Sequence, residues 1–378
     1  MELEIVKYIK EHGLDKTIKD FKLDLRDYGH KILLKYNMIY SPMNRIEVQE
    51  ARGLILEKGT WKIMCLPFKR FFNSEEPNAA KIDWGTAQVF EKIDGSLSTL
   101  YYDWVKNEWR VSTSGMAEAE GLVNNKDGLT FAQLFWETIE KIFLKSKLDF
   151  QKKLLPGFCY PCELTGPYNI IITPHKTSCV TLLTVRNLES LEEKPYDVAV
   201  IVAKSLNIPI VKCFDLNVKN AAELKKTFDG MPFFEEGYVV RDHKDNRVKV
   251  KNPAYLAAHM LKSKSSEYHI LDIVKSNEVE EYASTFIERK EEIYKLSARY
   301  NELLTQLENT WVELQNHLPK NITAGEKKKF AMAVFDICKK NNVVQFSSLY
   351  FNLKDGKSKS IREYIMDFDN RKLYQILK

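Results

Sequence analysis

The residues whose types and spacing could perform covalent chemistry lie in one short stretch, Glu91-Lys92-Ile93-Asp94-Gly95-Ser96. A lysine stands two residues before an Asp-Gly pair, and apolar, strand-like residues flank the stretch on both sides. Asp-Gly between such runs predicts a tight turn between two strands. An amine held at such a turn and directed into a cleft can act as a covalent nucleophile. Ordinary surface turns show the same pattern, so the rest of the chain must supply the support that Lys92 needs.

A pair of lysines near residue 250 supplies part of it. Arg247-Val248-Lys249-Val250-Lys251 alternates strictly, which places Lys249 and Lys251 on one face of a strand. Glu235-Glu236-Gly237 runs into the preceding strand, its expected hairpin partner. Two lysines on one strand face repel each other unless an anion lies between them. An exposed, solvated strand face is the alternative interpretation.

Two further segments could contact a nucleotide. Arg52-Gly53 opens an apolar strand, and residues 61–66 read as its hairpin partner across Lys58-Gly59-Thr60. Next comes Pro67-Phe68-Lys69-Arg70-Phe71-Phe72-Asn73, which mixes basic and aromatic residues. Such a mixture can stack a base and hold a phosphate. A loop with core-facing phenylalanines explains the same segment equally well.

Periodicity divides the chain into two parts. Short strands and a helix over residues 130–145 precede Pro253, whereas strand signals are sparse after it. Apolar residues recur at near-heptad spacing over residues 278–318, which predicts a long helix or a helical bundle, with a coiled-coil dimer as the alternative. We therefore expect an α+β domain at residues 1–258 and an all-α domain at residues 259–378.

Composition limits the class of protein. The 378 residues are 44% hydrophobic and 12% aromatic, enough for two domains with real cores. No apolar run is long enough for a membrane span, and residues 1–4 lack a signal-peptide pattern. Six cysteines do not form a disulfide framework in a chain of this length, so we expect an intracellular protein, cytoplasmic or nuclear. The lone Cys159-x-x-Cys162 lacks the second ligand pair that zinc requires.

Charge is unevenly distributed along the chain. Residues 326–378 hold 12 Lys/Arg against 6 Asp/Glu, or +6, so the total of +5 leaves −1 for residues 1–325. A basic end on a near-neutral body suits a polyanionic partner such as RNA. A solvated, lysine-rich tail would have the same composition.

The order of these motifs is more specific than any one of them. It runs from the Arg-Gly strand through Phe-Phe-Asn, Lys-x-Asp-Gly, a Glu after a proline-rich turn, an apolar strand ending in Arg, and Glu-Gly-Tyr to Lys-x-Lys. This order resembles the covalent lysyl-nucleotidyltransferase superfamily of polynucleotide ligases and capping enzymes, and within it the T4 RNA ligase 1 family. The similarity covers about residues 52–251. It implies a nucleotidyltransferase fold of ATP-grasp-like antiparallel sheets with flanking helices.

The resemblance also implies roles for the matching residues. Lys92 would be the adenylated nucleophile, Glu91 would border the adenine, and Asp94 and Gly95 would complete the lysine turn. The remaining nucleotide-binding positions would be Arg52, Arg70, Phe72, Glu163, Arg186, Gly237, Lys249 and Lys251, and the metal ligands would be Glu236 and Glu163. Two positions depart from the family pattern. Arg70 stands where the family has lysine, and Ser114 stands before Gly115 where the phage enzyme has lysine.

The chemistry implied is RNA ligation. Lys92 would attack the α-phosphorus of ATP, and the AMP would pass to a 5′-phosphate RNA end, which a 3′-hydroxyl then attacks. Mg²⁺, with Mn²⁺ as a substitute, would be the metal ion. A free lysine is protonated at neutral pH, and the neighbouring Lys249 and Lys251 would favour its neutral form. The expected partner is RNA with 5′-phosphate and 3′-hydroxyl ends, tRNA being one candidate, and the protein is expected to be a monomer.

Two other functions are consistent with parts of the pattern. A GTP-dependent mRNA-capping guanylyltransferase uses the same lysine chemistry, but such enzymes carry an OB-fold after the catalytic domain, whereas this chain ends in helical patterns. A non-catalytic RNA-binding protein with an inactive nucleotide pocket is the second alternative. Labelling of the protein by ATP or by GTP would separate all three.

Overall fold

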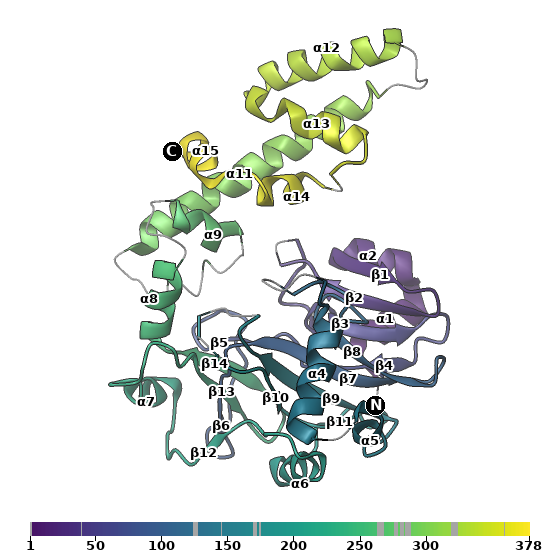
Figure 1. Cartoon of the computed structure of the whole chain (residues 1–378). Coiled ribbons are helices and arrows are strands. Elements are labelled where there is room, and N and C mark those ends of the chain that lie inside the picture. Colours follow the sequence, from purple (N-terminus) through teal and green to yellow (C-terminus); the bar gives the residue numbers. More distant parts are fainter. Residues whose placement is uncertain are drawn as a thin grey trace. The chain divides into compact units, whose positions relative to one another are not determined.

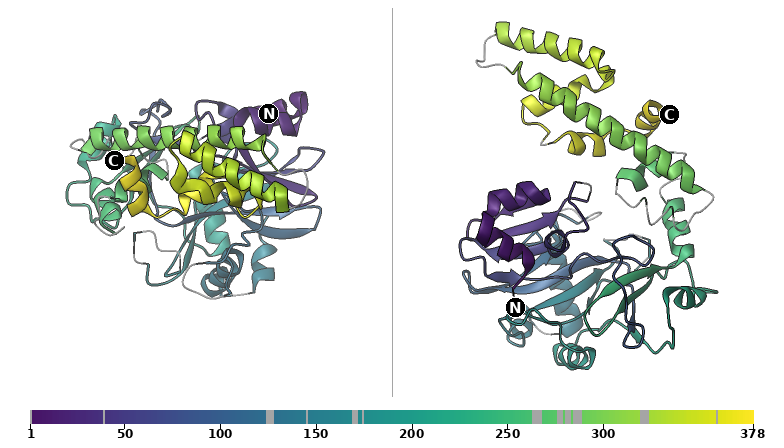
Figure 2. Two further views of the ribbon diagram at one scale, coloured as in Figure 1. Left: turned by 90° about the horizontal axis from the view of Figure 1, so that it is seen from above. Right: turned by 180° about the vertical axis from the view of Figure 1, so that it is seen from behind.

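Two compact units make up the computed structural model of the chain, Met1–Lys262 and Ser263–Lys378 (Figures 1 and 2). The structure describes residues 2–38, 40–123, 128–144, 146–168, 172–173, 175–262, 268–275, 279, 283, 289–318, 324–358 and 360–378. Helices occur together with largely antiparallel sheets, which is the α+β class predicted from the sequence. The division between the units falls close to the domain boundary expected after residue 258.

The first sheet has the strand order β1-β2-β3-β4, and helices cover its apolar core. β3 and β4 pair antiparallel, which confirms the hairpin predicted across residues 58–60. The elements of this part of the chain are α1 (Glu4–His12), α2 (Leu14–Phe21), β1 (Leu23–Asp27), β2 (Lys31–Tyr36), α3 (Ile46–Glu50), β3 (Arg52–Glu57) and β4 (Ile63–Cys65).

The second sheet has the order β10-β9-β7-β8, with β11 paired to β9. Helix α4 covers one face of it, as Figure 1 shows, and buries Leu134, Phe135 and Ile139 in the core there. A capping box between Thr130 and Gln133 starts α4. The elements are β7 (Ser96–Asp103), β8 (Glu108–Thr113), α4 (Phe131–Phe143), α5 (Lys147–Gln151), β9 (Phe158–Thr165), β10 (Cys179–Leu182), β11 (Arg186–Asn187) and α6 (Tyr196–Leu206).

The third sheet has the order β12-β6-β13-β14-β5. β13 and β14 form the hairpin predicted from the sequence, with Val239 opposite Lys249 and Arg241 opposite Arg247. One face of this sheet buries an apolar cluster that includes Val240. The elements are β5 (Phe72–Asn73), β6 (Gln88–Glu91), β12 (Cys213–Phe214), α7 (Ala221–Lys226), β13 (Gly237–Arg241), β14 (Arg247–Lys251) and α8 (Pro253–Lys262).

The Lys92 stretch connects the second and third sheets. The sequence predicts a tight turn between neighbouring strands there, and this prediction is wrong. β6 pairs with β12 and β13, whereas β7 pairs with β8 and β9. Residues 92–95 therefore cross from one sheet to the other. Asp-Gly produces a sharp change of direction in either case, and its local preference does not say which strands pair on either side of it.

A β-bulge opens β3. Leu34 pairs with Leu54 and Lys35 with Arg52, so Gly53 is the extra residue. Gly53 has φ +76°, and an added Cβ would lie 2.9 Å from the Cα of Ser114. Only glycine allows this close approach of β3 to the turn that follows β8. The bulge thereby sets the direction of Arg52 at the start of β3.

The second unit is helical throughout its described residues. Leu304, Leu307 and Leu314 of its longest helix are buried, together with Phe330 and Tyr350 of later helices. The sequence predicts a long helix or a bundle over residues 278–318. Residues 290–315 form one long helix that belongs to this helical unit, whereas several others, including Phe286, lie outside the described residues. The elements are α9 (His269–Lys275), α11 (Lys290–Gln315), α12 (Ala324–Lys340), a 3₁₀ turn (Val344–Phe346), α13 (Ser347–Lys354), α14 (Ile361–Met366) and α15 (Asn370–Leu377).

Among the helices that the structure describes, none has the length and apolar character that crossing a bilayer requires.

Candidate active site

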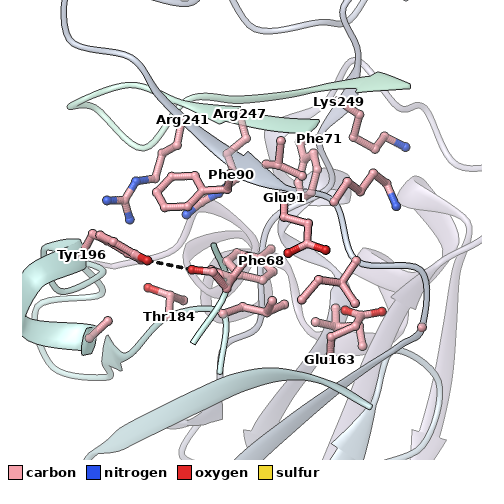
Figure 3. A pocket seen from close by; sticks show the side chains of 18 of the residues that line it. Phe68, Phe71, Phe90, Glu91, Glu163, Thr184, Tyr196, Arg241, Arg247 and Lys249 are labelled. Atoms are coloured by element: carbon pink, nitrogen blue, oxygen red, sulfur yellow. Dashed lines mark hydrogen bonds between the residues drawn. The ribbon is translucent and has the colours of Figure 1, made fainter. Parts of the chain in front are cut away.

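A cavity of about 280 Å³ lies in the first unit, between the second and third sheets (Figure 3). Of the thirteen residues assigned from the sequence, seven line it, namely Arg52, Glu91, Lys92, Gly95, Glu163, Lys249 and Lys251. The other six lie outside its lining, and these are Arg70, Phe72, Asp94, Arg186, Glu236 and Gly237. Glu236 nevertheless contacts the cavity residue Lys92 directly. The structure thus brings the central residues of the predicted site together around one cavity, and it places the other six assigned residues outside the cavity lining.

Lys92 is held at both its backbone and its side chain. Its backbone N–H donates to the carbonyl oxygen of Gly237 at 2.9 Å. Its Nζ lies 2.5 Å from Oε1 of Glu236, and the Nζ of Lys251 lies 3.7 Å from the same oxygen. One carboxylate oxygen is therefore shared by two ammonium groups. The contact holds the Lys92 amine in place and also marks Glu236 as the group nearest to its proton.

Two glycines make this arrangement possible. Gly237 has φ +129°, and an added Cβ would meet the carbonyl oxygen of Val250 and lie 2.9 Å from the Cα of Lys251. Gly95 has no room for a side chain either, because a Cβ would lie 2.7 Å from the carbonyl oxygen of Leu164. Close packing at Gly95 presses the Lys92 stretch against β9, the strand that carries Glu163. Close packing at Gly237 places its carbonyl oxygen on the Lys92 backbone.

Asp94 organises a neighbouring loop and does not line the cavity. Its Oδ2 accepts the backbone N–H groups of Ile172, at 2.9 Å, and Thr173, at 2.7 Å. Its backbone oxygen lies 2.9 Å from Nε2 of His175. Burial opposes ionisation of the Asp94 carboxyl, but these N–H donors outweigh it and lower its pKa. The described part of the 172–175 loop is thus tied to the turn that carries Lys92.

Glu163 faces the cavity in an environment that disfavours its charge. Burial raises the pKa of Glu163 to about 8, against the lowering effect of Lys92 and with a further raising effect of Glu236. At neutral pH its carboxyl is therefore largely protonated. It would ionise if a cation bound beside it. Within the described residues no group of three or more His, Cys, Asp or Glu side chains is arranged to hold a metal ion.

The basic aromatic segment contributes different residues from those assigned. Phe68 and Phe71 line the cavity, and the guanidinium of Arg52 lies 5.2 Å from the centre of the Phe71 ring. Phe72 instead belongs to β5, which pairs with β14, and is buried. The guanidinium of Arg70 lies 5.4 Å from the Phe72 ring and donates to the Tyr36 hydroxyl at 3.2 Å. Alternation along the segment directs Phe71 to the cavity and Phe72 away from it.

A buried carboxylate organises the arginines of the cavity wall. Glu193 forms ion pairs with Arg186, Arg241 and Arg247, and its Oε1 accepts from Nη1 of Arg247 at 2.8 Å. Burial opposes its charge, but Arg247 and Arg186 overcome this and lower the pKa of Glu193 to about 2. Arg241 and Arg247 line the cavity, whereas Arg186 lies behind them. Arg186 therefore contacts this cluster, not the cavity assigned to it.

Sequence reasoning missed Arg241 and Arg247, although a signal was present. The alternation that places Lys249 and Lys251 on one strand face also places Arg247 there. The hairpin register then puts Arg241 directly opposite Arg247. No local sequence pattern predicts the role of Glu193. It follows the apolar strand by several residues and contacts the arginines only in the folded chain.

The cavity has two chemically different ends, as Figure 3 shows. Phe90, Tyr196 and Arg241 lie toward one end, and Lys249 lies toward the other. The Phe90 and Tyr196 rings meet edge to face at 5.3 Å, and the Tyr196 hydroxyl donates to the carbonyl oxygen of Val211 at 2.8 Å. These contacts fix the orientation of the two rings, which form the aromatic wall at this end of the cavity. Glu91 lies between the two ends.

Comparison with known proteins defines the class. A sequence model of RNA ligases, of the T4 RNA ligase 1 type, matches residues 50–255, more than half of the 378 residues. Every residue that lines the cavity falls within the matched segment. The chain belongs to the T4 RNA ligase 1 family, which confirms the resemblance drawn from its motifs.

Individual relatives are more distant. The RNA ligase of Rhodothermus phage RM378 is 24% identical over an alignment of 374 residues, which covers 82% of this chain and 83% of that protein. A putative bifunctional polynucleotide kinase/RNA ligase of Autographa californica nuclear polyhedrosis virus is 26% identical over 294 residues, 70% of this chain and 38% of that protein. An RNA ligase of Naegleria gruberi, solved with ATP and Mn, aligns with a TM-score of 0.37 at 18% identity over 46% of this chain. The chain spans about half of that solved protein, 52%.

Substitution of Gly237 tests the backbone anchor of Lys92. Gly237→Ala should destabilise the protein by about 1–3 kcal/mol because the added Cβ meets β14 at a positive φ. Gly230→Ala is a matched control, since Gly230 has φ +78° with nothing within 4 Å of an added Cβ. Urea unfolding of both variants measures the difference. Equal stabilities would show that the packing at Gly237 is not tight.

Glu193 makes stability depend on acid pH. Its pKa of about 2 lies below that of an unfolded glutamate, so its contribution is present above pH of about 4 and is lost as the pH falls toward 2. The shift corresponds to stabilisation on the order of 3 kcal/mol. Glu193→Gln should remove it and leave three arginines without their carboxylate. Urea unfolding between pH 7 and 3 measures this. The free energy of unfolding should fall less with decreasing pH in Glu193→Gln than in the exposed control Glu192→Gln, and an equal pH dependence in both variants would contradict the assignment.

Proposed function

We propose that the protein is an ATP-dependent RNA ligase that joins 5′-phosphate and 3′-hydroxyl RNA ends through lysyl-AMP and AMP-capped RNA. The observation that carries this is the position of Lys92. Its amine lies in the cavity wall, 2.5 Å from Glu236, in a chain that belongs to the RNA ligase family. Repair of cleaved RNA, tRNA among them, is the role that such an activity would serve.

The two ends of the cavity suit the two ends of ATP. Adenine would lie at the Phe90 and Tyr196 wall, where an aromatic face can stack on a base. The Glu91 carboxylate would accept a hydrogen bond from the exocyclic amine of adenine. The triphosphate would then extend toward Lys92, Lys249 and Lys251, whose charges complement phosphate oxygens. This orientation brings the α-phosphorus to the Lys92 amine.

The first step replaces one bond at the α-phosphorus. The Lys92 Nζ would form a P–N bond as the P–O bond to pyrophosphate breaks, and Lys251 would stabilise the charge that develops on the phosphoryl oxygens. The amine must lose a proton to attack. Oε1 of Glu236 lies close enough to accept it directly.

The next two steps move the AMP and then release it. An oxygen of the RNA 5′-phosphate would attack the phosphorus of lysyl-AMP, which forms a phosphoanhydride and breaks the P–N bond. The 3′-hydroxyl of the second RNA end would then attack the 5′-phosphate, forming the phosphodiester as AMP leaves. Lys92 regains its free amine in the process.

The carboxylates of the site fit a divalent cation. Glu236 disfavours the charge of Glu163, and a bound cation would offset that effect. Their oxygens suit Mg²⁺, which takes few protein ligands and completes its shell with water and phosphate, and Mn²⁺ would substitute. When bound, such an ion neutralises charge on the phosphates. Glu236 and Glu163 are the residues that would hold it.

Labelling tests the nucleophile and the nucleotide together. Incubation with α-labelled ATP and Mg²⁺, followed by denaturation, should leave label on the wild-type protein and none on Lys92→Ala. Lys176→Ala, a lysine outside the cavity lining, should label normally. Label from GTP alone would favour a capping guanylyltransferase, and folded protein that takes no label from either nucleotide would exclude both enzymes.

The basic helix of the second unit is expected to contribute to RNA affinity. Lys327, Lys328 and Lys329 lie exposed on α12. Replacing all three with alanine should leave labelling of Lys92 unchanged and weaken joining. It should also reduce the slope of log affinity against log salt by as much as about 2–3, because fewer counterions are released. Filter binding of single-stranded RNA across a salt series measures this, and an unchanged slope would refute the role.

A further inference from the structure

Lys35 of β2 stands directly opposite Arg52, at the bulge that opens β3. Directly opposed residues have Cβ atoms about 4.5–5.5 Å apart, and like charges at such positions destabilise a sheet. Arg52 lines the cavity, and Lys35 stands next to it in the sheet without being part of the lining. Two cationic side chains thus stand at opposed positions, an arrangement that is unfavourable unless an anion binds between them.

The other lysine of β2, Lys31, is neutralised by two carboxylates. Lys31 lies four residues before Lys35 and so on the same face of β2. Its Nζ lies 2.8 Å from a carboxylate oxygen of Asp103 and 3.0 Å from one of Glu118. Within the part of the chain that the structure describes, Lys35 forms no ion pair. The guanidinium of Arg52 lies over the Phe71 ring, and its acidic neighbour Glu163 has a pKa raised to about 8 and so carries little charge at neutral pH. The positive charge of this cation pair is therefore available to an external anion.

The Lys35 side chain reaches the turn that follows β8. Its Nζ lies 3.6 Å, and its Cδ 3.9 Å, from the position that a Cβ on Gly115 would occupy. The neighbouring Ser114 packs against Gly53, the residue after Arg52. Lys35, Arg52 and this turn thus converge from three segments of the chain. A side chain at residue 115 would occupy space next to the ammonium group.

We propose that Lys35 and Arg52 together bind a phosphate group at the wall of the cavity. The guanidinium offers a planar fork of donors and the ammonium a compact charge, a combination that suits phosphate oxygens. Two phosphates qualify: the β- and γ-phosphates of ATP and the 5′-phosphate of the RNA end. The inference rests on the proposed function, which brings both phosphates to this cavity.

The central variant is Lys35→Met, which removes the charge and keeps most of the apolar stem. One measurement is the rate of lysyl-AMP formation at a series of ATP concentrations. Another is the joining of pre-adenylated RNA to a 3′-hydroxyl end without ATP. A third uses inorganic pyrophosphate as a probe and follows the thermal unfolding temperature, which rises when a ligand binds the folded state.

The two sources of phosphate give different results. If Lys35 holds the β- and γ-phosphates, Lys35→Met should raise the KM for ATP roughly tenfold to a hundredfold, the size expected for a lost charge-assisted hydrogen bond. It should also abolish most of the pyrophosphate stabilisation, while pre-adenylated RNA is joined normally. If Lys35 holds the RNA phosphate, lysyl-AMP should form normally and joining should slow by a similar factor.

Three further variants separate charge from structure. Lys35→Arg keeps the charge and should stay near wild type. Adding Ser114→Lys to Lys35→Met places a new ammonium beside the lost one and should restore most of the activity. Lys19→Met removes an exposed charge from α2, outside the cavity lining, and should change none of the measurements.

The outcomes distinguish this inference from the proposed function. A wild-type protein that forms no lysyl-AMP would refute the proposed function. A wild-type protein that forms it, with Lys35→Met equal to Lys19→Met in all three measurements, would overturn the role of Lys35 alone. A defect in Lys35→Met that Lys35→Arg shares and Ser114→Lys does not relieve would also overturn it, because the cause would then be packing.

Discussion

The contact on which the candidate site depends is a single carboxylate oxygen between two ammonium groups. Oε1 of Glu236 lies 2.5 Å from Nζ of Lys92 and 3.7 Å from Nζ of Lys251. Two like unit charges about 4 Å apart repel each other by about 4 kcal/mol at an effective dielectric constant of about 20. Without the carboxylate, placing both lysines in this wall would therefore be costly. The contact requires Gly237, because only a residue without Cβ lets β13 begin so close to β14.

The third sheet separates charge from apolar surface between its two faces. Val248 and Val250 are buried on one side, and the residues that alternate with them carry positive charge to the other. Glu193 neutralises the arginines at one end of this face, and Glu236 forms an ion pair with Lys251 at the other. Removing one partner from such a buried cluster leaves uncompensated charge, which costs more than the pair contributes. Charge balance in this wall is therefore a condition of folding as well as of chemistry.

Sequence patterns predicted the parts of the site that depend on strand alternation. Lys249 and Lys251 share a face because period-two alternation is a property of any strand. The sequence could not show that β6 and β7 belong to different sheets, because strand pairing is decided by contacts distant in the chain. The choice of Phe71 over Phe72 depends on where β5 joins β14, and the position of Lys35 depends on the bulge at Gly53. Each of these is set by tertiary packing, which a motif does not encode.

The resting state of the site constrains the order of events in the proposed reaction. An ammonium bound to a carboxylate has no lone pair to offer, so Lys92 must pass its proton on before it attacks. Glu163, whose pKa of about 8 keeps it largely protonated, does not compete with Glu236 for the ammonium. A divalent cation held by Glu163 and Glu236 would favour the ionised form of Glu163. Glu236 therefore positions the Lys92 amine and at the same time withholds its lone pair, so the contact that orders the nucleophile also keeps it inactive until the proton leaves.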